Sequence, residues 1–133
     1  MKYLLDTNLC INFLRGRTSS LKARFMTVPR SQKYLCPVVQ AELYFGGYNS
    51  AYPQAALEIL QQFLVRFPVL PFDQAAAKKY GEIRARLTRQ GNLIGPYDLQ
   101  IAAIALAHSA VVVTHNTEEF GRVAGLEVED WEA

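Results

Sequence analysis

Short apolar runs alternate along the chain with longer segments in which apolar residues recur at helical spacing. The apolar runs at 3–5, 34–36, 69–70 and 111–113 are continuous, which predicts strands buried on both faces, as in a parallel sheet, with the first strand over 2–6. Val128 indicates a brief last strand. Strands that alternate with helices are typical of βαβ units, so the pattern predicts an α/β fold.

The segments between these strands have the periodicity and the end signals of helices. Asn8 is predicted to cap a first helix that ends near Gly16, and Pro37 and Pro96 suit the first positions of two later helices. Gly46-Gly47 predicts the end of the helix that begins at Pro37. Further helices are expected around 21–28, 57–67 and 76–87, with a loop or short helix over 114–120.

Length and composition indicate the class of protein. The chain has 133 residues, half of them hydrophobic, which is enough apolar material for one globular domain over 1–133. It has no apolar run near the ~20 residues of a membrane helix and no signal-peptide core, so no membrane association is expected. Cys10 and Cys36 match no metal-binding spacing and are expected to be buried, reduced thiols of a cytoplasmic protein. His108 is predicted to end a helix, and the sequence leaves the role of His115 open.

Single acidic residues stand at the edges of apolar segments. Asp6 directly follows the first predicted strand, and Glu42, Asp98 and Glu119 come later in the chain. Carboxylates gathered in one place repel each other unless a cation lies between them, and hard divalent ions such as Mg²⁺ or Mn²⁺ prefer oxygen ligands. In an open parallel sheet the ligand crevice lies beyond the carboxyl ends of the strands, where Asp6 and residues 114–119 are expected.

Each acid also has an ordinary structural explanation. Asp98 in the first turn of a helix interacts favourably with the helix dipole, and Glu42 in mid-helix would usually be exposed. Most of the acidic C-terminal stretch, which begins at Glu118, is expected to be solvated surface. Asp6 precedes the predicted cap and ends a buried strand, which favours a functional role.

The positive charge is concentrated away from the acidic C-terminus. Residues 1–117 carry thirteen Lys and Arg against six acids, and both 7–41 and 83–97 contain no acid. A basic body around a few fixed carboxylates suits a polyanionic substrate cleaved at a metal, although an unevenly charged surface is the simpler alternative. The bases of 15–33 and 84–89 would hold such a substrate, in particular Arg15, Arg84, Arg86 and Arg89.

Four short motifs in order resemble one known family. They are Asp6-Thr7-Asn8, the Gln-Ala-Glu-Leu segment around Glu42, Gly-Pro-Tyr-Asp98-Leu-Gln-Ile-Ala-Ala, and Thr114-His-Asn-Thr-Glu-Glu119-Phe. Together with the chain length and the closing Glu-Asp-Trp, they resemble a PIN domain, specifically a VapC-type toxin ribonuclease of a bacterial toxin–antitoxin pair. The resemblance implies a three-layer α/β/α sandwich around a short parallel sheet, Mg²⁺ or Mn²⁺ at the acidic cluster and cleavage of RNA. It also implies a homodimer and inhibition by a VapB-type antitoxin.

One position departs from the family pattern. Many members have a fourth Asp near the last motif, whereas Asn116 stands here, and Glu119 would turn back toward the site if its segment is helical. Asp6 and Asp98 are therefore the predicted metal ligands, with Glu42 and Glu119 as further catalytic acids. Thr7, Asn8, Thr114 and Asn116 are the predicted supporting polar residues.

In the predicted mechanism a metal-bound water attacks the scissile phosphate, Glu42 orients that water or binds a second ion, and Tyr44, Tyr48 or Tyr97 stacks a base. A structured RNA such as a tRNA loop would suit single-strand readout. A haloacid-dehalogenase-like phosphatase would need an Asp at position 8, and a response-regulator receiver would need a late Lys, but none follows Lys79. A non-catalytic RNA- or protein-binding module on the same fold is the alternative that Asn116 keeps open.

Overall fold

The computed structural model describes residues 1–16 and 18–133, and a parallel β-sheet lies at its centre. Its strands are β1 (Tyr3–Leu5), β2 (Lys33–Tyr34), β3 (Val111–Val113) and β4 (Val128–Glu129), in the order β2-β1-β3-β4. Every neighbouring pair is parallel. The predicted α/β fold with a short parallel sheet is therefore confirmed.

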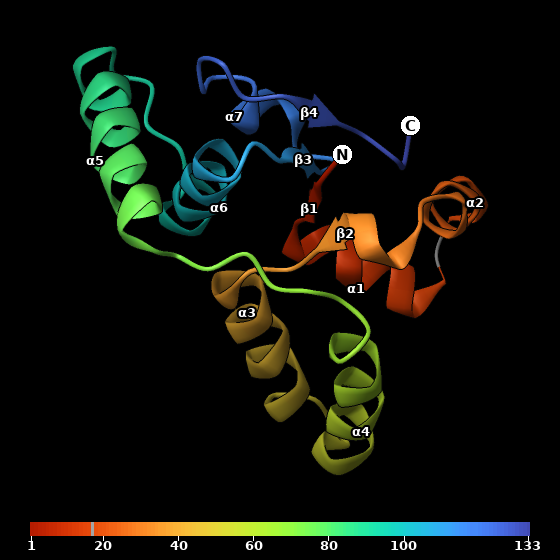
Figure 1. Ribbon diagram of the computed structural model, residues 1–133. Coiled ribbons are helices and arrows are strands. Elements are labelled where there is room, and N and C mark those ends of the chain that lie inside the picture. Colours follow the sequence, from red (N-terminus) through yellow and green to blue (C-terminus); the bar gives the residue numbers. More distant parts are fainter. Residues whose placement is uncertain (17) are drawn as a thin grey trace.

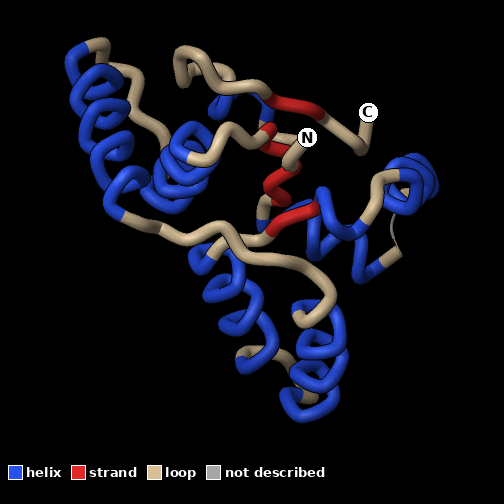
Figure 2. The backbone as a smooth tube through the Cα atoms, in the orientation of Figure 1, coloured by secondary structure: helices blue, strands red, loops and turns tan. Residues whose placement is uncertain are grey.

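Helices cover both sides of this sheet. They are α1 (Thr7–Arg15), α2 (Ser19–Thr27), α3 (Pro37–Tyr48), α4 (Pro53–Leu64), α5 (Gln74–Arg89), α6 (Pro96–Ala107) and α7 (Thr117–Phe120), with a 3₁₀ turn over Arg30–Gln32. Figures 1 and 2 show α5 and α6 on one side of the strands and α1 and α2 on the other, which is the expected three-layer arrangement. None of the described helices is long and apolar enough to cross a membrane.

Three local predictions are wrong: the cap of the first helix, the end of the helix that begins at Pro37, and the strand at 69–70. The cap of α1 is Asp6 rather than Asn8, because the helix begins at Thr7 and the Asp6 Oδ1 atom accepts a hydrogen bond from Leu9 N–H at 2.9 Å. Helix α3 continues through Gly46-Gly47, since the missing side chain of Gly47 leaves room for Leu57 of α4. The run at 69–70 forms only a single bridge, between Leu35 and Val69.

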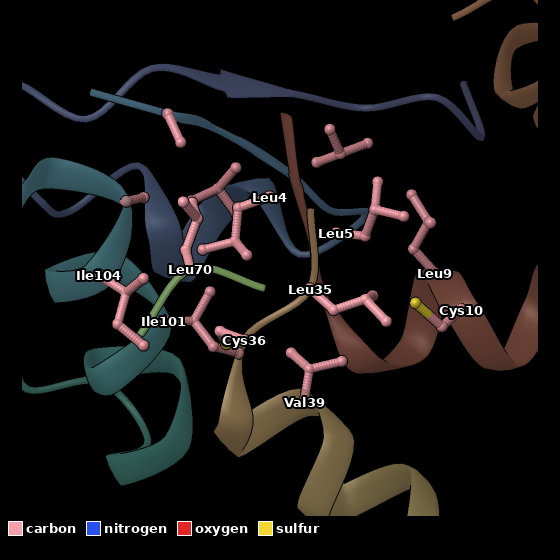
Figure 3. Close-up of a cluster of buried hydrophobic side chains, with 14 of the residues drawn as sticks. Leu4, Leu5, Leu9, Cys10, Leu35, Cys36, Val39, Leu70, Ile101 and Ile104 are labelled. Carbon is pink, nitrogen blue, oxygen red and sulfur yellow. The ribbon is translucent and has the colours of Figure 1, made fainter. Parts of the chain in front are cut away.

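The core lies between the sheet and the helices. Figure 3 shows Leu4 of β1 on the side of Ile101 and Ile104 of α6 and Leu5 on the side of Leu9 of α1, and all five are fully or almost fully buried. The alanines of α6 at 102, 103 and 105 are also fully buried, so their small side chains allow the helix to pack closely. Cys10 and Cys36 are buried free thiols, as predicted. Burial raises the pKa of Cys36 to about 11, which keeps this thiol protonated and unreactive.

The register of the sheet decides which polar residues meet at its carboxyl edge. Leu5 of β1 is the register partner of Val113 of β3, which in turn is the partner of Glu129 of β4. Because the strands are parallel, the residues that follow them emerge side by side: Asp6, Thr114 and Asp130. The fold therefore brings Asp6 next to the segment that begins at Thr114 and carries the last motif.

Candidate active site

Asp6 is the most buried acid of the site. Its backbone N–H continues the sheet by donating to Val113 O at 3.1 Å, while its side chain caps α1, and only 5% of the residue is exposed. Burial raises the pKa of Asp6 to about 6, and the carboxylates of Glu132 and Glu42 add to this rise. Hydrogen bonding from the Thr114 side chain and from Leu9 N–H works in the opposite direction.

Thr7 and Glu42 connect the first helix to α3. The Thr7 hydroxyl donates to the Glu42 Oε1 atom at 2.6 Å, across a sequence separation of 35 residues. Glu42 is half-buried and is not an ordinary surface residue of the helix. The hydrogen bond fixes the direction of the Glu42 carboxylate beside the carboxyl end of β1.

Asp98, Asn116 and Glu119 form a second group. The Asn116 Nδ2 atom donates to Glu119 Oε2 at 2.6 Å and to Asp98 Oδ2 at 3.4 Å, and Glu119 Oε1 accepts from Gly95 N–H at 3.0 Å. The segment over Thr117–Phe120 is helical, and Glu119 does turn back toward Asp98. Asn116 thus joins two carboxylates and contributes no charge of its own.

The pKa values of Asp98 and Glu119 are shifted in opposite directions. Burial raises the pKa of Asp98 to about 7, and the neighbouring carboxylates of Glu119, Asp6 and Glu42 contribute to the rise. The pKa of Glu119 is lowered, first by its hydrogen bond with Asp98 and then by Gly95 N–H. At neutral pH the two carboxyls therefore compete for one proton, which Asp98 holds more strongly.

The predicted acids occupy one region but are not a closed ligand set. The carboxylate of Glu42 raises the pKa of both Asp6 and Asp98, and that of Asp6 raises the pKa of Asp98, which places the three acids within electrostatic reach. Among the described residues, however, the one group of three possible ligands whose atoms lie within 4.8 Å of one another is His115, Asp130 and Glu132. The ligand atoms of the predicted acids are therefore more widely spaced than those of a closed set of protein ligands.

The remaining supporting residues differ in their placement. Thr114 is fully buried, and its Oγ1 accepts a hydrogen bond from Asn116 N–H at 2.9 Å, which shapes the turn after β3. Asn8 is exposed and lines a groove instead of joining the acids. Thr114 therefore lies beside Asp6, whereas Asn8 lies outside the group of acids.

Sequence reasoning missed the part played by the C-terminal stretch. Glu132 was expected on the solvated surface, yet its Oε1 atom accepts a hydrogen bond from Asn12 Nδ2 at 2.8 Å, and its charge acts on Asp6. Trp131 holds this stretch in place because it is 4% exposed and packs on Tyr3 with ring centroids 5.4 Å apart. A lone Trp between two acids was the signal for an anchored segment.

The basic residues differ in exposure and in the contacts they make; Arg84, although exposed, donates to the Tyr80 hydroxyl at 3.2 Å. Arg15 is exposed at the end of α1, and three arginines are exposed along α5: Arg84, Arg86 and Arg89. Lys33, predicted to hold substrate, is 3% exposed, and its Nζ atom donates to Phe25 O at 2.7 Å beneath the Phe25 ring. The prediction for Lys33 is therefore wrong. Arg24 pairs with Glu129 at 3.3 Å, and Arg17 lies outside the described residues.

An apolar groove leads away from the acids. A hollow of about 640 Å³ between α1, α3 and the start of α6 is lined by Thr7 and Glu42 at one end and by Ile11, Phe45 and Tyr97. A second hollow of about 250 Å³ shares Ile11 and Glu42 with it and extends to Ile59 of α4. Phe45 is 69% exposed, so the groove presents apolar surface directly beside the carboxylates.

The raised pKa values lead to a prediction about stability. For both acids the folded-state pKa lies above the ordinary 3.8. The stabilising effect of their protons is therefore complete below about pH 4 and is lost as pH rises through about 6 and 7. Asp98→Asn retains a neutral group that can donate to Glu119. In EDTA, the melting temperature of Asp98→Asn minus that of the unsubstituted protein should become larger from about pH 5 to about pH 8. Only the unsubstituted protein loses the stabilising proton of Asp98 over this interval.

The control for this prediction is Glu58→Gln, which neutralises an exposed acid of α4. It should show no such pH-dependent gain in thermal denaturation followed by circular dichroism. A constant difference between Asp98→Asn and the unsubstituted protein across this pH interval would refute the assigned protonation of Asp98.

Comparisons with known proteins identify the family to which this chain belongs. The chain matches the PIN domain family model over residues 3–126. It is 40% identical over 131 residues to the tRNA(fMet)-specific endonuclease VapC of Shigella flexneri, covering 98% of both chains.

Two solved structures superpose closely on the fold. DNA-bound VapBC from Salmonella typhimurium gives a TM-score of 0.92 at 37% identity, with 98% of both chains covered. VapBC2 from Rickettsia felis, bound to a promoter DNA fragment, gives 0.91 at 32% identity, with 98% of this chain and 99% of the other covered. The chain therefore belongs to the PIN-domain family, as a member of its VapC ribonucleases.

Proposed function

We propose that this chain hydrolyses RNA phosphodiester bonds at the acidic site, with Mg²⁺ or Mn²⁺ held by Asp6 and Asp98. The observation that carries the proposal is the raised pKa of both carboxyls, to about 6 and about 7, caused by burial and by neighbouring acids. A cation between them would relieve both effects. The donors are oxygen atoms, which fit a hard divalent ion, and because they do not form a closed protein ligand set they suit an ion that keeps several waters, as Mg²⁺ does.

The chain's own residues would position the reactants. A bound divalent ion supplies positive charge that polarises a phosphate and lowers the pKa of a water molecule. Glu42, directed by the hydrogen bond from Thr7, is placed to orient that water and accept its proton. Asn116 donates hydrogen bonds to both Glu119 and Asp98, so that the two carboxyls are held together.

The first functional prediction concerns Asp98. Replacing it by Asn keeps the shape and removes the charge, so RNA cleavage in Mg²⁺ or Mn²⁺ should fall by roughly a hundredfold or more, the scale for removing one electrostatic contributor. Cleavage by the unsubstituted protein should stop in EDTA. Rates are measured on labelled RNA after the protein has been freed of any partner and shown to be folded by circular dichroism.

Two further variants separate the possible outcomes. Asp6→Asn should lose cleavage as well, whereas Glu58→Gln should retain it, because Glu58 is an exposed acid of α4 outside the site. Unchanged cleavage by a folded Asp98→Asn protein would show that the acids are not the catalytic centre.

The proposed substrate is a structured RNA, with transfer RNA as the first to test. The similar protein of Shigella flexneri is named for cleavage of tRNA(fMet), and the exposed arginines of α5 offer phosphate contacts. Helix α5 ends at Arg89, seven residues before the start of α6, which carries Asp98 in its first turn. Arg15, at the end of α1, borders the groove beside Glu42. Tyr97 is 54% exposed next to Asp98, where it could stack a base.

The arginines give a second prediction. Simultaneous replacement of Arg84, Arg86 and Arg89 by Ala should reduce the slope of log affinity against log salt by about two, since each phosphate contact to single-stranded RNA contributes about 0.7. The slope is measured with Asp98→Asn protein, so that bound RNA stays intact. A control with Lys2, Arg66 and Lys78 replaced, which are exposed elsewhere, should keep its slope. An equal loss in both proteins would mean that these arginines have no special role.

A VapB-type antitoxin is the proposed partner, because the similar Salmonella and Rickettsia chains come from VapBC structures. The apolar groove beside Thr7 and Glu42 suits an amphipathic antitoxin segment anchored on Phe45. Such a segment would reach the acids with an Arg, whose fork pairs two carboxylate oxygens. We also propose that the chain is a single domain that forms a homodimer and acts in the cytoplasm.

The groove and the acids should be separable in binding experiments. Phe45→Ala should weaken an antitoxin peptide at least about tenfold, as expected for a buried aromatic anchor, whereas Val65→Ala, which removes an exposed apolar group outside the groove, should not. A rising Mn²⁺ concentration should weaken binding of the unsubstituted peptide. It should not weaken binding of a peptide whose Arg is replaced by Ala. Peptide affinity that ignores both Mn²⁺ and the Arg would mean that the antitoxin acts only by blocking the RNA path.

A further inference from the structure

His115, Asp130 and Glu132 form a compact cluster at the edge of the site. His115 follows β3, and the two acids follow β4, the neighbouring parallel strand. One ligand atom from each residue lies within 4.8 Å of the other two. The His115 Nδ1 atom is 3.0 Å from Asp130 Oδ2, and Thr114 N–H donates to Glu129 O at 2.9 Å, which holds the two segments together.

The two acids are held in place by their backbone. Trp131 between them is buried, and its Nε1–H donates to Glu129 Oε1 at 3.0 Å. Glu132 N–H donates to Asp130 Oδ1 at 2.9 Å, which orients the Asp130 carboxylate, and Asn12 Nδ2 donates to Glu132 Oε1 at 2.8 Å. The cluster is therefore preorganised, so that binding a ligand would cost little ordering entropy.

One oxygen of Glu132 lacks a partner. Glu132 Oε1 accepts from Asn12, but Oε2 is buried and has no hydrogen-bond donor among the described residues. A buried carboxylate oxygen without a donor is costly unless a cation approaches it. This independent observation indicates a cation at the cluster.

The donor set distinguishes this cluster from the acids around Asp6. One imidazole nitrogen with two carboxylates leaves a further coordination position open, and this combination favours a borderline ion such as Zn²⁺ over Mg²⁺. We propose that His115, Asp130 and Glu132 form a second metal site that takes Zn²⁺ or a similar transition-metal ion. The proposal does not depend on the ribonuclease activity, because it concerns metal binding alone.

Calorimetric titration with Zn²⁺ in saturating Mg²⁺ tests this site. Mg²⁺ competes with Zn²⁺ at the all-oxygen site, and the difference between the variants assigns the remaining Zn²⁺ signal to the cluster. His115→Gln should weaken Zn²⁺ binding at least about tenfold. The matched control is His108→Gln, at the histidine that ends α6 and lies 3.3 Å from Asp73; it should bind Zn²⁺ as the unsubstituted protein does.

Cobalt gives a second readout that does not involve activity. Co²⁺ in place of Zn²⁺ should produce visible absorption that is kept in Asp98→Asn and lost in His115→Gln and in Glu132→Gln. His115 is exposed, so its variant should remain folded, as checked by circular dichroism. Absence of Zn²⁺ binding to the unsubstituted protein, or equal affinities for His115→Gln and His108→Gln, would overturn the proposal.

Discussion

The structure depends on the burial of several like charges at one edge of a parallel sheet. Asp6 is 5% exposed at the end of β1, and Glu42 and Asp98 lie within electrostatic reach of it. Isolated carboxylates at such positions destabilise the fold, and their raised pKa values express that cost. A bound cation would relieve this cost, which is why the acidic edge is the proposed functional centre of the chain.

The same residues also build the local structure around them. Asp6 caps α1, Thr7 in the first turn of α1 directs Glu42 of α3, and Asn116 joins Asp98 to Glu119. Because the Thr7–Glu42 and Asn116–Asp98 contacts cross between elements, Glu42 and Asp98 are positioned by the fold, while Asp6 and Glu119 are held by local capping contacts. The apolar groove includes two of these residues, Thr7 and Glu42, so that whatever occupies it lies next to the proposed catalytic acids.

Periodicity predicted β1 and β3 because they are apolar throughout, and it predicted the longer helices because their apolar residues recur at helical spacing. It also placed Asp6 and residues 114–120 at one edge, since parallel strands share their carboxyl ends. What it missed depends on contacts distant in sequence. Gly47 stays helical because it packs against Leu57, Lys33 is buried because it donates to Phe25 O, and Glu132 reaches Asp6 because Trp131 anchors the tail. Asp6 and Asn8 are both good caps, so composition alone could not choose between them.

The central claim is that Asp6 and Asp98 jointly bind the catalytic divalent ion. Crystals grown with Mn²⁺ and measured near the manganese absorption edge test it most directly. The account predicts an anomalous peak between the Asp6 and Asp98 carboxylates that disappears in crystals of Asp98→Asn. A peak elsewhere only, or one that survives this substitution unchanged, would contradict the account.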